Sequence, residues 1–175
     1  MKRNYYIVLL IFLIFFVISF ITNILGALNP NVINSFNLSL TLSAFLPFAF
    51  FIAYGIISIP AGMLVEKYKE KNIMLLAFLI AFLGALLFSV FPNYIVFIAS
   101  LFMMGAGMAM LQVAINPLLR VSGGEEHFAF NSVLAQLIFG GASFLAPMFL
   151  TFLISELDGQ NKNFVKTIFS SLVPA

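Results

Sequence analysis

The chain has 175 residues, of which 63% are hydrophobic and 8% are charged, and its net charge is +2. A water-soluble domain of this length needs more surface charge to stay solvated, so the composition excludes an ordinary soluble protein. The absence of cysteine excludes disulfides and cysteine-ligated metals, and the few basic residues form no extended stripe for a nucleic acid.

Three long segments contain no Asp, Glu, Lys or Arg: residues 4–65, 72–119 and 128–155. A charge in the middle of a bilayer costs roughly 2.5–3.5 kcal/mol. These segments are therefore predicted to lie in lipid, and the charged residues between them in water. About 20 apolar residues cross a hydrocarbon core of roughly 30 Å. The sequence thus predicts an all-α, multi-pass membrane protein.

Turn-forming residues divide the uncharged segments into five predicted spans, at about residues 5–28, 40–65, 72–91, 94–119 and 128–155. The first span is too long for the core of a cleaved signal peptide, which has roughly 7–15 residues. The polar stretch from Asn29 to Ser39 is expected to end this span. Pro92-Asn93 predicts a tight turn between the third and fourth spans. Residues 156–175 are expected to form an outer loop or tail.

The basic residues indicate the orientation of the chain. With the N-terminus in the cytoplasm, six of the eight basic residues lie inside, namely Lys2, Arg3, Lys67, Lys69, Lys71 and Arg120. Only Lys162 and Lys166 then lie outside. Because cytoplasmic loops are enriched in Lys and Arg, the N-terminus is predicted to be cytoplasmic, in a cell (plasma or inner) membrane.

Uncharged polar side chains within the spans are the candidates for function. They are Ser19, Thr22 and Asn23 in the first span, Tyr54 and Ser58 in the second, Gln112 and Asn116 in the fourth, and Asn131, Gln136 and Ser143 in the fifth. The i, i+4 spacing places Gln112 and Asn116 on one face of a helix. An unpaired amide in hydrocarbon costs several kcal/mol. Two interpretations stay open: hydrogen bonds between helices, or a polar cavity for a neutral polar solute.

No Asp, Glu, Lys, Arg or His lies within a predicted span, so no residue there is suited to relaying a proton or neutralising an ion. His127 follows Glu125 and Glu126, but one histidine and two adjacent carboxylates rarely bind one metal ion together. We expect these residues to cap and solvate the start of the fifth span. No phosphate-binding glycine loop, zinc-protease motif or nucleophile–base pair is present. We therefore expect neither enzymatic activity nor a cofactor.

The segment 60–71, PAGMLVEKYKEK, resembles the loop between helices 2 and 3 of the major facilitator superfamily. In that pattern Glu66 replaces the usual Asp, Lys69 stands where Gly is expected, and Glu70 interrupts the basic run. The fourth and fifth spans resemble, more specifically, the fucose and glucose/galactose permease branch. This likeness rests on LQVAINP at 111–117, GGE at 123–125, Asn131, the pair Ala135-Gln136, and Asn23 seven residues before Pro30.

The resemblance covers about residues 1–155 and implies five helices of an incomplete six-helix N-terminal half. It implies a sugar transporter of the twelve-helix, two-half design, which works by alternating access. By position, the residues lining the sugar cavity would be Asn23, Gln112 and Gln136, with Asn116 and Asn131 supporting them. The contact between helix bundles would be formed by Gly62, Glu66 and Lys67.

Two positions depart from the proton-coupled fucose permeases, which carry an Asp on the first helix and a Glu on the fourth. This chain has Gly26 and Gln112 there. The glucose/galactose side of the branch can carry Gln on the fourth helix, so the loss at Gly26 is the atypical one. The sequence therefore predicts a facilitator, or coupling to another ion, in place of proton symport.

Length is the other departure, because after five spans the chain has only a short apolar stretch at 164–173. We expect the N-terminal fragment of a sugar transporter. Its expected partners are a small sugar, the lipid bilayer and the remainder of the transporter, the sixth helix and C-terminal half. The alternative is a complete five-span subunit of a multisubunit, respiratory-type membrane complex. That alternative explains the odd number of helices but leaves the loop at 60–71 unexplained.

Overall fold

The computed structural model describes residues 4–159, with side chains for residues 4–155. The helices are α1 (Tyr5–Ser35), α2 (Leu40–Tyr68), α3 (Glu70–Val90), α4 (Tyr94–Gly123), the short 3-10 helix η1 (Glu125–His127) and α5 (Phe128–Gly159). The five α-helices are long and apolar enough to cross a membrane, and the described residues contain no strand. The prediction of an all-α membrane protein with five spanning helices is confirmed.

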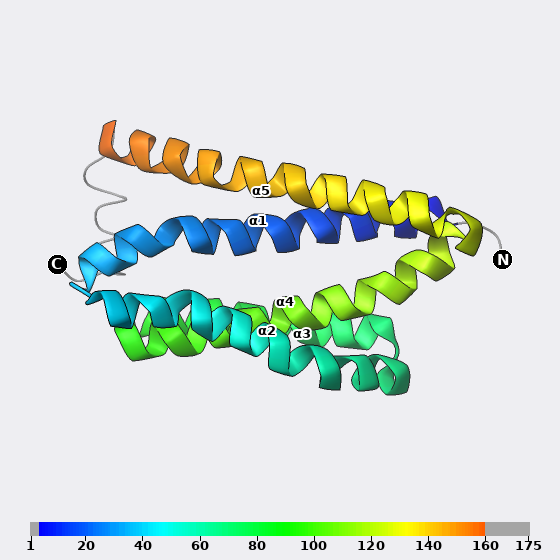
Figure 1. Cartoon of the computed structure of the whole chain (residues 1–175), viewed down its shortest axis with the longest axis horizontal. Helices are drawn as coiled ribbons and strands as arrows, with labels where there is room; N and C mark the ends of the chain where they lie inside the picture. The colour runs from blue at the N-terminus through cyan, green and yellow to red at the C-terminus, as the bar shows by residue number, and fades with distance from the viewer. Residues whose placement is uncertain (1–3, 160–175) are drawn as a thin grey trace.

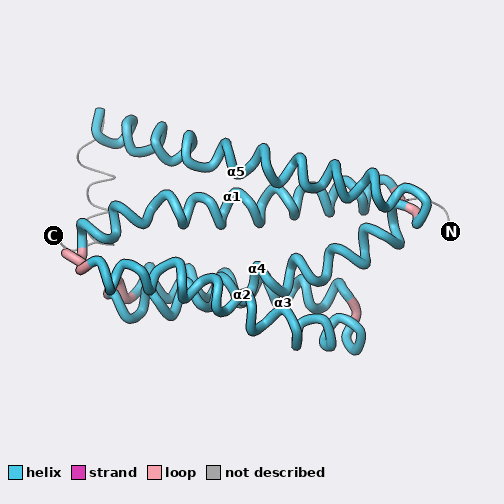
Figure 2. The backbone as a smooth tube through the Cα atoms, viewed as in Figure 1, coloured by secondary structure: helices cyan, strands magenta, loops and turns pink. Residues whose placement is uncertain are grey.

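The helices form two layers that share one long axis. Figure 1 shows α1 beside α5 in one layer, and α2, α3 and α4 together in the other. Both α2 and α3 pack along α4, whereas α5 packs along α1. The layers meet where α1 contacts α4 and where η1 connects α4 to α5. The connecting loops lie at the two ends of the bundle, as the tube in Figure 2 shows.

Small residues make α4 the most buried of the five helices. A Cβ atom added at Gly105 would collide with the backbone carbonyl of Phe50 in α2, and one added at Gly107 would lie 2.7 Å from the carbonyl oxygen of Ala77 in α3. Neither position can carry a side chain without a shift of the neighbouring backbone. In membranes such small residues let helices approach closely, and dispersion contacts then hold them together.

Polar caps fix where three helices begin. The side chain of Asn4 accepts a hydrogen bond from the Ile7 N–H (3.4 Å), that of Ser39 from Leu42 (3.3 Å), and that of Asn93 from Val96 (3.0 Å). Each satisfies an amide that the first turn of a helix leaves without a partner. The predicted starts of the first, second and fourth spans therefore coincide with capped helix ends.

The turn between α2 and α3 depends on Lys69, whose φ of 66° lies in the left-handed region. Glycine adopts this region without a steric penalty, whereas other residues are strained there. Lys69 is the position at which the superfamily loop is expected to carry glycine. The positive φ at this position is a backbone reason to expect glycine there, and this chain adopts it with lysine.

Helix α1 is longer than the predicted first span of about 5–28: it continues through Pro30 and ends at Ser35, within the polar stretch 29–39. The φ of proline is compatible with a helix, but proline has no N–H to donate to the carbonyl four residues earlier. A proline inside a helix therefore costs one hydrogen bond and does not have to end the helix. Membrane helices accept this loss where the freed carbonyl finds another partner. The expected tail at 156–175 begins with the last turn of α5, and residues 160–175 lie outside the described part of the chain.

We expect Gly105→Ala to destabilise the bundle, because overpacking of this kind costs about 1–3 kcal/mol. Gly55→Ala in α2 is the matched control, since nothing lies within 4 Å of its added Cβ. It should be neutral or slightly stabilising, because alanine favours a helix interior by up to about 1 kcal/mol. The measurement is unfolding of the purified chain by SDS titration in mixed micelles. Equal midpoints for the two variants would contradict the close contact of α4 with α2.

Candidate functional site

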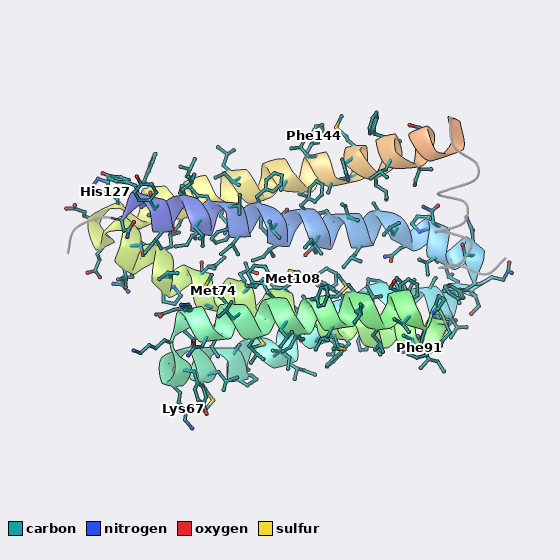
Figure 3. All side chains as sticks on the ribbon, turned by 180° about the vertical axis from the view of Figure 1, so that it is seen from behind. Lys67, Met74, Phe91, Met108, His127 and Phe144 are labelled. Atoms are coloured by element: carbon teal, nitrogen blue, oxygen red, sulfur yellow. The ribbon has the colours of Figure 1, made fainter. Side chains whose placement is uncertain are left out.

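Charged side chains of the described region gather at one end of the bundle. Arg120 forms an ion pair with Glu125, and His127 Nδ1 lies 3.6 Å from a carboxylate oxygen of Glu126. Figure 3 shows Lys67 at this same end and Phe91 at the opposite one. Within residues 4–155, the membrane-spanning parts of the helices therefore carry only neutral polar groups, and any chemistry there must come from them.

A hydrogen-bond network joins α1 to α5 and includes the first predicted sugar-binding residue, Asn23. Its Nδ2 donates to the backbone oxygen of Ser19 (2.8 Å), and its Oδ1 accepts from the Ser143 hydroxyl (3.0 Å). Ser19 in turn donates from its own hydroxyl to the carbonyl oxygen of Phe139 (2.6 Å). We call Ser19, Asn23 and Ser143 the α1–α5 clamp. The clamp holds the Asn23 amide at both ends, so its orientation is fixed.

The two polar residues of α4 are in different situations. Asn116 is exposed, and its Nδ2 donates to the backbone oxygen of Gln112 one turn earlier (2.9 Å). The carboxamide of Gln112 is half-buried and makes no hydrogen bond with any described residue. The predicted shared face exists, yet only Gln112 offers a free amide there.

The two predicted residues of α5 also differ. Asn131 is half-buried and packs against Gly123 of α4, where an added Cβ would collide with its Nδ2 atom. Gln136 is exposed, and its carboxamide has no hydrogen-bond partner among the described residues. The predicted site residues thus take part in three separate contacts: the clamp at Asn23, the pair Gln112–Asn116, and the packing of Asn131 against Gly123. Gln136 stands apart from all three.

An open cleft of about 170 Å³ lies between α1, α2 and the first half of α4. Its α1 wall carries the polar side chains of the cleft, Thr22, Asn23 and Asn29, together with Leu25 and the backbone of Gly26. The opposite wall is apolar and consists of Leu46, Pro47, Phe50 and Phe51 from α2 and Leu101 from α4. One polar and one aromatic wall suit a solute that has both hydroxyl groups and apolar C–H surface.

A second groove, of about 370 Å³, lies at the charged end. It is lined by Gly62, Val65, Glu66, Lys69 and Glu70 from the α2–α3 region, and by Val113 and Pro117 from α4. Two of the three residues predicted for the contact between bundles, Gly62 and Glu66, therefore line a groove. The third, Lys67, is exposed, and its Nζ lies 5.2 Å from the ring centroid of Tyr68.

The sequence of residues 11–170 matches the Major Facilitator Superfamily. This chain belongs to that superfamily. Five apolar helices, buried small residues on α4 and the loop at 60–71 are features that the match explains together. The resemblance to the fucose and glucose/galactose permease branch is also confirmed, and the length of the chain is consistent with the N-terminal part of such a protein.

Curated relatives carry sugar-transporter names. The chain is 35% identical over 145 residues to the glucose/galactose transporter of Brucella abortus, which covers 81% of this chain and 35% of the relative. It is 32% identical over 154 residues to the L-fucose-proton symporter of Escherichia coli, covering 86% of this chain and 35% of that protein. The chain therefore spans about a third of the length of these relatives.

Solved structures agree with the sequence comparison. A transporter of the superfamily, FucP, in the outward conformation superimposes with a TM-score of 0.72 at 29% identity, over 95% of this chain and 43% of that one. A variant of the E. coli fucose:proton symporter FucP gives a TM-score of 0.65 at 28% identity, over 93% of this chain. The arrangement of the five helices is thus the one found in these transporters.

Sequence reasoning missed the partners of Asn23 and the aromatic wall of the cleft. Ser143 is separated from Asn23 by 120 residues, and no local pattern links them. Phe50 and Phe51 gave no signal of their own, because the chain has 23 phenylalanines and most have no distinguishing neighbours in sequence. The i, i+4 spacing of Ser19 and Asn23 was the one available sign that α1 carries a polar face.

We expect Asn23 and Ser143 to be energetically coupled. A double-mutant cycle with Asn23→Ala and Ser143→Ala, measured by SDS unfolding, should give a coupling of about 0.6 kcal/mol, the average for hydrogen bonds between membrane helices. Thr151→Val is the control, because the Thr151 hydroxyl bonds only to the backbone oxygen of Pro147 in its own helix. Its coupling to Asn23→Ala should be near zero. Equal coupling in both cycles would argue against the clamp.

Proposed function

We propose that this chain forms the N-terminal part of a secondary transporter, which moves a neutral hexose or fucose-like sugar across the cell membrane by alternating access. The names of its relatives support a sugar as solute. Its partners would be the sugar, the lipid bilayer and the further helices that such a transporter contains. The proposal includes no enzymatic reaction, because these relatives are transporters.

The observation that carries the proposal is the unpaired state of Gln112 and Gln136. Each has a carboxamide without a hydrogen-bond partner among the described residues, within a helix that is apolar enough to span a membrane. Such an amide costs several kcal/mol in hydrocarbon, so it must face water or a polar solute. Carboxamides both donate and accept, which is what sugar hydroxyls require. Asn23 would line the site together with the two glutamines, and Asn116 and Asn131 would support it.

A five-span subunit of a respiratory-type complex is not favoured. It would explain neither the match to the superfamily over residues 11–170 nor the structural agreement with FucP.

The proposal is tested by sugar uptake. In cells that express the full-length gene and lack their own sugar uptake, Gln112→Ala and Gln136→Ala should each raise KM about fivefold, because a neutral hydrogen bond contributes about 1 kcal/mol. Ser58→Ala is the control, since its hydroxyl bonds to the backbone of Tyr54 in its own helix. Uptake that is unaffected by both glutamine substitutions would remove the site assignment, and no uptake of glucose, galactose or fucose would remove the function.

We also propose that the sugar moves without a proton. In the described membrane-spanning regions only neutral polar groups occur, and the first-helix position that is acidic in proton-coupled fucose permeases is Gly26 here. Addition of sugar to cells in weakly buffered medium should therefore leave the external pH unchanged. The E. coli L-fucose-proton symporter serves as the positive control. Alkalinisation of the medium in step with uptake would show that proton coupling survives in this chain.

The proposed orientation places the N-terminus in the cytoplasm. The described basic residues lie at the end of the bundle where α1 begins, and the loops at the opposite end carry no charge, as positive-inside topology requires. Because the chain has no native cysteine, single cysteines report this directly. A membrane-impermeant maleimide should label Phe91→Cys in intact cells, and Lys71→Cys only after lysis. The reverse pattern would invert the topology.

A further inference from the structure

The polar wall of the α1–α2–α4 cleft contains a backbone group that has lost its partner. Pro30 lies inside α1 and has no N–H, so the carbonyl of Gly26, four residues earlier, lacks its helical donor. Because Gly26 has no side chain, its backbone is what lines the cleft. Nothing lies within 4 Å of the Cβ position at Gly26, so this part of the helix is open to a ligand.

The side chains around this carbonyl add further neutral acceptors. Thr22 and Asn29 line the same wall, and their side chains make no hydrogen bond with any described residue. Asn23 also lines it, with its Nδ2 committed to Ser19 and one lone pair of its Oδ1 committed to Ser143. No charged side chain lines the cleft. A wall of neutral oxygens without an anion suits a hydroxyl donor better than a metal cation, whose desolvation requires stronger ligands.

The opposite wall suits the same class of ligand. Phe51 is 63% exposed and lines the cleft beside Phe50, whose ring packs against it edge to face at a centroid distance of 5.5 Å. The C–H faces of a pyranose ring are apolar and pack on aromatic surface, while its hydroxyls project from the rim. A volume of about 170 Å³ is roughly ten times the space that one water needs.

The geometry points to a hydroxyl subsite in this cleft, in which the Gly26 carbonyl freed by Pro30 accepts a hydrogen bond from one hydroxyl of the transported sugar, while Phe51 covers the ring. This inference rests on the proposed transport function and makes it more specific. It assigns a specificity-determining role to a proline that contacts no ligand itself. At the position where proton-coupled fucose permeases have a carboxylate, the acceptor would be a backbone oxygen that does not titrate.

The test uses the substitution Pro30→Ala, which restores an N–H donor to the Gly26 carbonyl and leaves every side chain of the cleft in place. Uptake by the full-length transporter should show KM for the parent sugar raised about fivefold, with the maximal rate unchanged. For one monodeoxy analogue, the one that lacks the bonded hydroxyl, wild type and Pro30→Ala should have equal KM. For the other monodeoxy analogues the fivefold difference should persist.

Two further variants separate this effect from a general change in the helix. Pro60→Ala removes an exposed proline from α2 outside the cleft, and should leave KM unchanged for every sugar. Gly26→Ala keeps the freed carbonyl but puts a methyl group into the cleft, and should raise KM for the parent sugar and all analogues alike. It remains informative if Pro30→Ala fails to fold.

The outcomes distinguish this inference from the function on which it rests. Absence of uptake by the wild type would overturn both. Normal wild-type uptake with equal KM for Pro30→Ala and Pro60→Ala would overturn the subsite alone. A rise in KM for Pro30→Ala that is the same for every deoxy analogue would also overturn it, because no single hydroxyl would then depend on the carbonyl.

Discussion

The close approach of backbones at Gly105 and Gly107 is the constraint on which the rest of this structure depends. Lipid tails are as apolar as leucine, so burial from water does not drive one membrane helix against another. The stability of helix packing depends instead on how closely the backbones approach. Helix α4 permits a close approach on two sides, toward Phe50 of α2 and toward Ala77 of α3. The same contact fixes Phe50 in the wall of the cleft, so the packing of α4 determines the shape of the candidate site.

The other layer is joined by a different kind of interaction. Two described hydrogen bonds connect α1 to α5, from Ser19 to Phe139 and from Ser143 to Asn23, and a third, from Asn23 to Ser19, lies within α1. No neighbouring atom lies within 4 Å of a Cβ added at Gly26, Gly140 or Gly141. Polar bonds of this type are directional, so they set the rotation of α1 about its own axis. That rotation presents Asn23 to α5 on one side and to the cleft on the other. One amide thereby links the packing of this layer to the polar wall of the site.

The sequence predicted the helices well and their partners poorly, for physical reasons. A bilayer penalises charge so strongly that runs without charge reveal spans, and Ser39 and Asn93 mark two helix starts through local bonds. Helix α1 extends past the predicted span of about 5–28, because a proline removes one hydrogen bond without ending a helix. Contacts between helices could not be predicted in this way, because residues such as Asn23 and Ser143 are far apart in sequence and meet only in the folded chain. The roles of Gln112 and Gln136 came from family resemblance, since spacing alone leaves packing and binding equally open.

A neutral site has consequences for how a transporter can work. Where a carboxylate accepts a sugar hydroxyl, its acceptor strength changes with its protonation, and binding of solute is linked to binding of a proton. A backbone carbonyl and carboxamides have no such second state, so their affinity for a hydroxyl does not vary with pH near neutrality. Residue 26 is glycine, and Pro30 withholds the amide that would otherwise occupy its carbonyl. In the proposed transporter, residues 26–30 of α1 would thus offer a neutral acceptor at a position without a titratable group, and recognition of the sugar would then be separate from movement of a proton.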